Sequence, residues 1–304
     1  MSRTIAVSLL AAFLFGATGF SADSQNRLTS EEAAAGWILL FDGQSSSGWR
    51  EVNGTEFPGD TWFVQDGCIG INSDPVTRKD VISDQAFTDY ELNFEWRLVA
   101  GGNSGVKYLV REGMLDPGRV GRRKQAMMLG GGLALLAIIT ALVLVKGSLS
   151  SNRPGLRKGL VVVCAVAVVG VGYCAVRVVS NSILGASAVG FEYQLYDDSR
   201  YEGLDVNLTS GALYDLLPPA QKATRPAGEF NESRIIVDHD HVEHWLNGIK
   251  LLEIELGSSK LRGLIEQSKF VTIPGFGERG PGHVVLQNHG DEVCFRNIKI
   301  RELD

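Results

Sequence analysis

The sequence has few of the features that identify common enzyme classes. It contains no GxSxG, HExxH or phosphate-binding Walker motif, which argues against the hydrolases, metalloproteases and nucleotide-binding enzymes that carry them. The glycine-rich stretch GGNSG (101–105) lies between two predicted strands, so we interpret it as a hairpin turn and not as a phosphate cradle. The sequence points to no certain cofactor, and it leaves room for a divalent metal without requiring one.

Cysteine is also scarce, with four residues in a chain of 304. Cys164 and Cys174 lie in an apolar run, so Cys68 and Cys294 remain as the two that an oxidising compartment could pair. No CxxC pair occurs, and no metal site of that kind is expected.

Acidic residues are nearly absent from one internal stretch, residues 113–187, which holds nine Lys or Arg and one acid, Asp116. The rest of the chain is acidic, which argues against nucleic acid as a partner because phosphate binding needs a positive surface. Two apolar runs in the stretch, 126–145 and 159–179, are each long enough to cross a membrane. We therefore predict a transmembrane helical hairpin with the membrane as a partner. A pair of buried core helices is the alternative.

The N-terminus has the layout of a secretory signal peptide, with one Arg before an apolar run from Ile5 to Phe15. We predict a signal peptide over 1–22 and an exported protein on the periplasmic or extracellular face, tethered to the membrane by the hairpin. An uncleaved anchor is the alternative. Because a hairpin returns the chain to the side it left, residues 23–112 and 188–304 are expected to form a single domain.

Outside the internal stretch, alternation of apolar and polar residues predicts β-strands. In TDYELNFEWRLV (88–99), one face is apolar and the other is polar. Further strands are predicted within SGVKYLVRE (104–112), FEYQLYDD (191–198), SRIIVDHDHVEHWLNGIKLLEIEL (233–256, three strands) and GHVVLQNHGDEVCFRNIKIREL (282–303, two strands). The Asn247–Gly248 pair is typical of a tight hairpin, and 258–270 is the one predicted helix. Many short strands with regular turns predict an all-β sandwich or jelly roll.

Polar side chains on these strands point away from the predicted apolar face. They are Glu95, Lys107, Glu192, Gln194, Gln287 and His289. Carboxylates, amides and an imidazole on one face suit a sugar, which also needs an aromatic platform. The aromatic residues available for this are Trp96, Tyr196, Tyr214 and Trp245. Each polar residue also has an ordinary interpretation, such as a cross-strand ion pair between Glu95 and Lys107.

Six ordered motifs resemble a known family. They are GWILLFDGQSSSGW (36–49), DYELNFEWRLVAGGNSGVKYLV (89–110), GFEYQLYDD (190–198), GALYDLLPP (211–219), PAGEFNESRIIVDHDHVEHWLNGIKLLEIEL (226–256) and GPGHVVLQNHGDEVCFRNIKIREL (280–303). Together they resemble the 3-keto-disaccharide hydrolase domain of secreted bacterial proteins. The resemblance implies a concanavalin-like jelly roll, interrupted at a surface loop by the predicted hairpin. One departure is Cys294, where the family usually has Trp.

The resemblance also implies an activity, the cleavage of glycosides oxidised at carbon 3. A ketone at carbon 3 acidifies the hydrogen on carbon 2, so a base can remove it while the carbon 1 substituent leaves, and water then adds back. Such a site needs a base, an acid and a donor near the ketone oxygen. The implied catalytic residues are Glu95 or Glu192 as base or acid, Lys107 as oxyanion stabiliser and His289 as second proton carrier. The residues expected to bind the substrate are Asn103, Gln194, Tyr214, Trp245 and Gln287.

Two other functions stay open on the sequence alone. An ordinary glycosidase would need two carboxylates about 5–9.5 Å apart across the scissile bond. A carbohydrate-binding module without catalysis would also fit, because this type of sandwich hosts lectins as well as enzymes.

Overall fold

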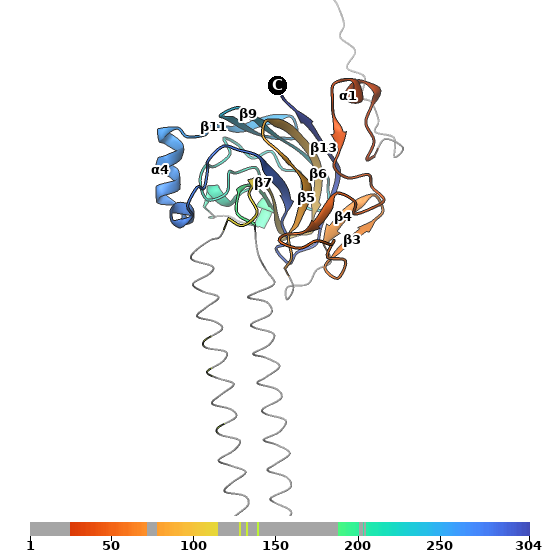
Figure 1. Ribbon diagram of the computed structural model, residues 1–304, viewed down its shortest axis with the longest axis horizontal. Helices are drawn as coiled ribbons and strands as arrows, with labels where there is room; N and C mark the ends of the chain where they lie inside the picture. Colours follow the sequence, from red (N-terminus) through yellow and green to blue (C-terminus); the bar gives the residue numbers. More distant parts are fainter. Residues whose placement is uncertain are drawn as a thin grey trace, which may run out of the picture.

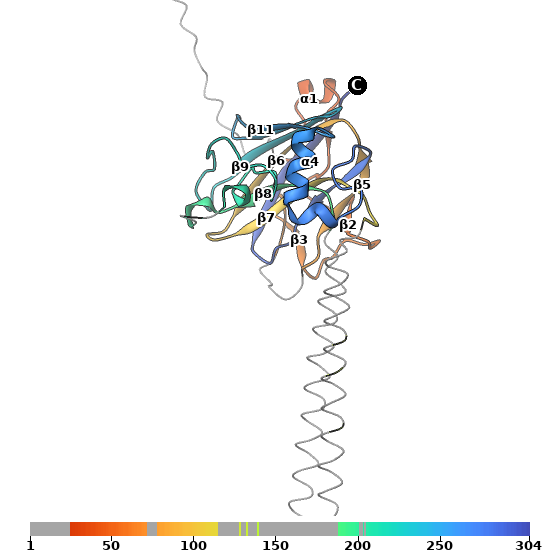
Figure 2. The same cartoon turned by 90° about the vertical axis from the view of Figure 1, so that its left-hand side faces the viewer.

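The computed structural model describes residues 25–71, 78–114, 188–200, 203 and 205–304, together with Met128, Gly132 and Ile139. Strands dominate this part of the chain. They form two antiparallel sheets that pack face to face as a sandwich of jelly-roll type (Figures 1 and 2).

The larger sheet has eight strands. They are β1 (Ile38–Leu39), β3 (Trp62–Gln65), β4 (Cys68–Ile71), β6 (Tyr90–Leu98), β9 (Asn231–Asp238), β10 (His241–Leu246), β11 (Ile249–Glu255) and β13 (Val293–Glu302). Their order is β11-β10-β9-β6-β13-β4-β3, and β1 pairs with β13 beside this path. A disulfide between Cys68 and Cys294 links β4 to β13, its neighbour in the sheet.

The smaller sheet has five strands. They are β2 (Trp49–Glu51), β5 (Val81–Phe87), β7 (Asn103–Val110), β8 (Phe191–Tyr196) and β12 (Gly282–Leu286), in the order β2-β5-β12-β7-β8. Both sheets combine strands that precede residue 114 with strands that follow residue 188. The described segments on the two sides of the internal stretch therefore share one core.

The core lies between the sheets and takes alternate residues from each strand, because successive side chains of a strand point to opposite faces. In β8, Phe191, Tyr193 and Leu195 belong to the hydrophobic core. Glu192 and Gln194 therefore lie on the outer face of the smaller sheet.

The strand predictions from alternation are confirmed, because β6 to β13 overlap the ranges predicted for them. Asn247 and Gly248 join β10 to β11 and both have positive φ, as a tight hairpin turn requires. The predicted helix is α4 (Ser259–Gln267), which begins after an N-cap at Ser258 and is followed by a turn of 3-10 helix, η4 (Lys269–Thr272). Figure 1 shows α4 at one flank of the sandwich and the short α1 (Ser30–Ala34) at the other.

A β-bulge near the end of β7 breaks the regular alternation. The pairing with β12 shifts between His283 and Val285, which lie opposite Val110 and Lys107. Leu109, in the extra position, has a positive φ of 50° and belongs to the core. The bulge lets two successive residues, Tyr108 and Leu109, face the core while Lys107 faces outward.

The fold prediction needs one correction, which concerns the transmembrane hairpin. A membrane span takes about 20 apolar residues in one helix, whereas α1 has five residues and α4 has nine. In the part of the chain that the structure describes, no helix has the length and apolar character needed to cross a membrane. The predicted sandwich is therefore correct, but the transmembrane hairpin predicted to interrupt it is wrong. The membrane is not supported as a partner.

The predicted spans, 126–145 and 159–179, lie outside the described residues except for Met128, Gly132 and Ile139. The predicted signal peptide, residues 1–22, also lies outside them. The hairpin prediction rested on the length and apolar composition of the two runs and on the basic residues that flank them.

Candidate active site

A cavity of about 210 Å³ lies over the outer face of the smaller sheet. Its lining residues on and beside the strands are Asn103, Lys107, Glu192, Gln194, Gln287 and His289. Its remaining lining residues come from loops and η4 and are Ala188, Val189, Gly190, Tyr214, Lys269, Phe270 and Ile273. The structure thus brings together seven of the nine residues that the sequence predicted for the site.

Glu192 reaches the cavity because the strand beside it carries no side chain at the point of closest approach. Glu192 lies opposite Lys107 in the register between β7 and β8, two pairs along from Gly105 and Gln194. A Cβ on Gly105 would lie 2.8 Å from Glu192 Oε1. Glycine is therefore needed at residue 105 for the Glu192 carboxyl to lie across β7.

The Glu192 carboxyl is buried and accepts hydrogen bonds from a neutral partner. Gln287 Nε2 lies 3.1 Å from each of its oxygens. Burial raises the pKa of Glu192, and the positive charge of Lys107 opposes this shift without cancelling it. Glu192 thus holds its proton to a higher pH than an exposed glutamate does, as a general acid at neutral pH requires.

Lys107 is the cation beside this carboxyl, and it is fixed in place. Its ammonium donates to Asp80 Oδ2 at 3.0 Å and to the Ala188 carbonyl at 3.3 Å. Both Lys107 and Asp80 are buried, so the pair is poorly screened by solvent. The result is a fixed positive charge in the wall of the cavity.

His289 follows β12 and contributes an imidazole. It is half-buried, and its Nδ1 lies 3.9 Å from Asp291 Oδ2. Burial lowers the pKa of His289, and the nearby positive charge of Arg78 lowers it further. The imidazole is therefore neutral near pH 7 and able to accept a proton.

The amides of the cavity have unused hydrogen-bonding capacity. Gln194 Nε2 donates to Asn103 Oδ1 at 3.0 Å. The buried Oε1 atoms of Gln194 and Gln287 have no hydrogen-bond partner among the described residues. Since leaving a buried polar atom unpaired is costly, these atoms are suited to accept hydroxyl hydrogens from a bound ligand.

One rim of the cavity comes from residues that the sequence reasoning missed. The ammonium of Lys269 lies 4.0 Å from the centre of the Tyr214 ring and 5.1 Å from that of Phe270. Phe270 stacks on Phe276 with ring centres 4.2 Å apart, which anchors η4 to the core. The only sequence signal for Lys269 and Phe270 was the helix predicted over 258–270.

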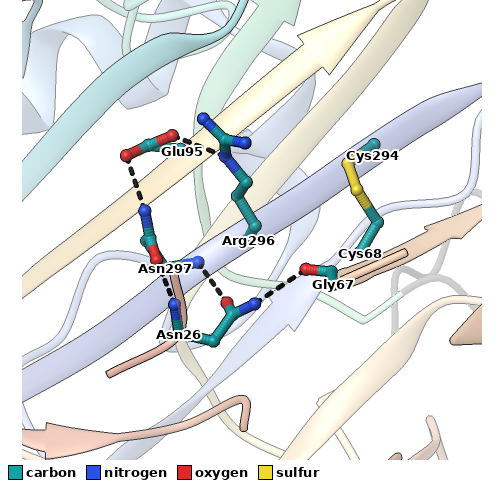
Figure 3. The surroundings of a disulfide bond; sticks show 7 residues. All are labelled: Asn26, Gly67, Cys68, Glu95, Cys294, Arg296 and Asn297. Carbon is teal, nitrogen blue, oxygen red and sulfur yellow. Dashed lines mark hydrogen bonds and ion pairs between the residues drawn. A yellow bond between two sulfur atoms is a disulfide. The ribbon is translucent and has the colours of Figure 1, made fainter. Parts of the chain in front are cut away.

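Glu95, the other predicted acid or base, lies elsewhere. It belongs to β6 of the larger sheet, where Arg296 Nε and Asn297 Nδ2 each donate to it at 2.7 Å. The backbone N–H groups of Asn26 and Asn297 each donate to the side-chain Oδ1 of the other residue. Asn26 Nδ2 in turn donates to the carbonyl of Gly67, next to the disulfide (Figure 3). Glu95 thus connects β13 to the N-terminal segment and is part of a structural network.

Trp245, the ninth predicted residue, is also remote from the cavity. It lies on β10 of the larger sheet, where its indole donates to Glu243 Oε2 at 2.6 Å. The guanidinium of Arg234 lies 5.5 Å from the centre of its ring. Its predicted role as a sugar platform in this cavity has no geometric support, and Tyr214 and Phe270 are the aromatic residues that line the cavity.

One group of side chains on the larger sheet has ligand types suited to a divalent metal. Ligand atoms of His241, Glu243 and Glu253 lie within 4.8 Å of one another. Lys250 donates to Glu243 at 3.2 Å and to Glu253 at 2.6 Å, so an ammonium already neutralises these carboxylates. The group is remote from the cavity, and we assign no chemistry to it.

Two known proteins are similar to this chain over most of its length. A Bacteroides thetaiotaomicron protein named 3-keto-disaccharide hydrolase is 27% identical over 292 residues, which cover 89% of this chain and 80% of that protein. A crystal structure of a glycosyl hydrolase-like protein of Parabacteroides distasonis matches with a TM-score of 0.62 at 26% identity, over 92% of this chain and 100% of the other.

The sequence profile of the 3-keto-alpha-glucoside-1,2-lyase-like domain matches residues 36–128 and 177–301. These two ranges make up more than half of the chain and include every residue that lines the cavity. The family expected from the sequence motifs is thereby confirmed, and the chain belongs to the 3-keto-alpha-glucoside-1,2-lyase-like domain family.

Proposed function

We propose that the protein cleaves glycosides whose sugar carries a ketone at carbon 3, by elimination across carbons 1 and 2 followed by addition of water. Family membership and the relative named 3-keto-disaccharide hydrolase support an enzyme of carbohydrate processing. The observation that carries the finer proposal is the buried carboxyl of Glu192 with its raised pKa, beside the fixed charge of Lys107.

The elimination step needs a base that removes the proton of carbon 2 and an acid that protonates the leaving oxygen. The base removes the hydrogen of carbon 2, the double bond between carbons 1 and 2 forms, and the bond from carbon 1 to the leaving oxygen breaks. We assign His289 as the base because its lowered pKa favours the neutral imidazole, and Glu192 as the acid because its raised pKa favours the protonated carboxyl. Water then adds to carbon 1, and carbon 2 regains a proton.

Negative charge develops on the ketone oxygen as the hydrogen of carbon 2 leaves, because the electron pair delocalises into the carbonyl. Lys107 is the buried cation of the cavity wall and is assigned to stabilise that oxygen. The amides of Gln194 and Asn103, together with Tyr214, lie around it and are assigned to orient the sugar hydroxyls.

The geometry does not favour an ordinary pair of catalytic carboxylates. Glu192 is the one carboxylate among the described residues that line the cavity. Glu95, the second candidate, is bound to Arg296 and Asn297 on the other sheet. A glycosidase of the usual kind needs both carboxylates at the scissile bond.

The test compares a 3-keto disaccharide with the same disaccharide left unoxidised, and adds a 3-keto substrate deuterated at carbon 2. We expect turnover of the 3-keto sugar and none of the unoxidised sugar. We also expect a lower kcat/KM for the deuterated substrate, because the bond between carbon 2 and its hydrogen or deuterium breaks in the slow step. Equal turnover of the unoxidised sugar would refute the elimination mechanism. Binding of both sugars without turnover would favour a binding module.

The roles of acid and base are separated by the leaving group. A 3-keto glycoside of a nitrophenol needs no protonation of its leaving oxygen, since nitrophenolate is a stable anion. Glu192→Gln should therefore recover most of its activity on this substrate, whereas His289→Asn should stay inactive. The reverse pattern would exchange the two roles.

We also propose that the protein is exported through the signal peptide predicted over residues 1–22. The Cys68–Cys294 disulfide supports this proposal, because such bonds persist in oxidising compartments. Cell fractionation with mass spectrometry of the mature N-terminus tests it. A full-length chain in the cytoplasmic fraction would contradict it.

A further inference from the structure

We propose that Asp80 is a positioning residue of this site: it holds Lys107 away from Glu192 and docks the turn that carries Gln287 and His289. Asp80 does not line the cavity and so is not assigned to touch the substrate. The inference rests on the proposed function, because Glu192 is the acid only in that reaction. The contacts of Asp80 are observed independently of it.

Asp80 occupies a rigid place just before β5. It is 5% exposed, and its carbonyl accepts a hydrogen bond from the backbone of Val52 at 3.1 Å. The preceding carbonyl, of Lys79, accepts from the indole of Trp62 at 2.7 Å. Two backbone anchors therefore fix the direction of the Asp80 carboxylate.

The two oxygens of this carboxylate contact two different parts of the site. Oδ2 accepts from the Lys107 ammonium at 3.0 Å, and Oδ1 accepts from the backbone N–H of Asn288 at 2.9 Å. The Asn288 side chain closes the same turn by accepting from the Gly290 backbone at 2.9 Å. Residues 287 and 289, on either side of Asn288, both line the cavity.

Lys107 does not form its ion pair with the acidic residue on the adjacent strand. Lys107 and Glu192 are directly opposite each other on neighbouring strands, where unlike charges usually pair. The ion pair that the structure shows for Lys107 is instead with Asp80, while Glu192 is held by the neutral amide of Gln287. Asp80 thus leaves Glu192 with a partner that carries no charge.

The pairing of Lys107 with Asp80 affects the protonation state of Glu192. The charged or titratable groups around it are Lys107 on β7, Lys269 on η4, Asp80 before β5 and His289 after β12. The two lysines favour the ionised carboxylate, whereas the negative charge of Asp80 favours the protonated form. Without Asp80, the Lys107 ammonium would be released toward Glu192, and the acid of the reaction would lose its proton.

The experiment titrates the Glu192 carboxyl by carbon-13 NMR in the folded protein, so that it does not depend on turnover. In Asp80→Asn, which keeps the shape of the side chain and an acceptor for Asn288, the titration midpoint of Glu192 should fall by about 1 pH unit or more. The matched control is Asp60→Asn, which removes the acid of an exposed pair with Lys79 at 3.0 Å and should leave the midpoint unchanged. An unchanged midpoint in Asp80→Asn overturns the proposal.

A double-mutant cycle separates positioning from simple charge. If Asp80 acts by holding Lys107, the fall caused by Asp80→Asn should be larger in the wild-type background than in Lys107→Met. Equal falls would show that Asp80 acts through its own charge alone and would contradict the proposal. The variant with both changes leaves neither Asp80 nor Lys107 as a buried unpaired charge, so it should fold even where the single changes reduce stability.

Turnover gives a second readout. In Asp80→Asn, the alkaline limb of the pH profile of kcat/KM should move to lower pH together with the Glu192 midpoint. A shifted midpoint in a protein without activity on 3-keto glycosides would uphold the role of Asp80 and count against the proposed reaction. The two claims therefore fail separately.

Discussion

The two outer faces of the sandwich carry similar residue types, but the hydrogen-bond partners of these residues differ. On the larger sheet, Glu95 is bound by Arg296 and Asn297, and its network reaches the disulfide region (Figure 3). On the smaller sheet, Glu192 is buried and bound by the amide of Gln287, and its pKa is raised. A glutamate with a cationic partner stabilises structure, whereas one with a neutral partner in a cavity remains available for proton transfer.

The histidines show the same contrast. His241, on the larger sheet, hydrogen-bonds to Glu255 and Glu243, and these bonds raise its pKa. Burial lowers the pKa of His289, in the cavity. The comparison teaches that the partner and the burial of a polar group, more than its residue type, separate a structural face from a chemical one.

The largest expected effect concerns the buried lysine of the cavity. Lys107→Met should lower kcat by about 100- to 1,000-fold, because the charge that stabilises the developing oxyanion is lost. Lys250→Met is the matched control, since Lys250 is paired with Glu243 and Glu253 on the larger sheet. Steady-state kinetics on a 3-keto glycoside should show no loss for the control. Equal losses in both variants would erase the distinction between the two faces.

The disulfide should matter for stability and not for chemistry. Cys68 and Cys294 are 226 residues apart in the chain, so their bond restricts a long loop of the unfolded state. Replacing both by Ser should lower the free energy of unfolding by about 2–5 kcal/mol. Denaturant titration measures this, and kcat well below the unfolding temperature should stay unchanged. A folded but inactive variant would indicate that the larger sheet takes part in catalysis, and would contradict the account.

Glu95→Gln should have a smaller effect of the same kind. The change removes the charge that receives the hydrogen bond from Arg296, and we expect a loss of about 1–3 kcal/mol in the free energy of unfolding. Urea titration of the variant beside the wild type measures it. Unchanged stability would mean that the network in Figure 3 contributes little.

The smallest effect is a pH dependence of stability that comes from His241. Because its folded pKa is raised by Glu255 and Glu243, its contribution is fully present below the unfolded pKa of about 6.5. That contribution is lost as the pH rises through the folded pKa. The difference in unfolding free energy between the wild type and His241→Gln should therefore be larger at about pH 5.5 than at about pH 9. A constant difference would contradict the assignment.

The sequence predicted local structure well because strand alternation and turn chemistry are local. Glu192 and Gln194 were placed correctly on the polar side of their strand, and Asn247–Gly248 was recognised as a turn. Alternation says which face of a strand a residue occupies, but not which sheet the strand joins. Glu95 and Glu192 were therefore grouped together although they belong to different sheets.

Other features depend on long-range contacts that leave no local pattern. Asp80 precedes a strand and touches Lys107 and Asn288, which are distant in sequence, so nothing around it indicated a role. Lys269 reaches the cavity only because η4 packs over Tyr214. The transmembrane hairpin was inferred from the length, apolar composition and basic flanks of the two runs, none of which gives information on tertiary structure.

The most direct test of the central claim compares Glu192→Gln with Glu95→Gln on one 3-keto disaccharide at pH 7, with folding verified for both. If the chemistry belongs to the cavity of the smaller sheet, Glu192→Gln should lose about 100-fold or more in kcat/KM and Glu95→Gln should match the wild type. An active Glu192→Gln beside a folded but inactive Glu95→Gln would contradict it.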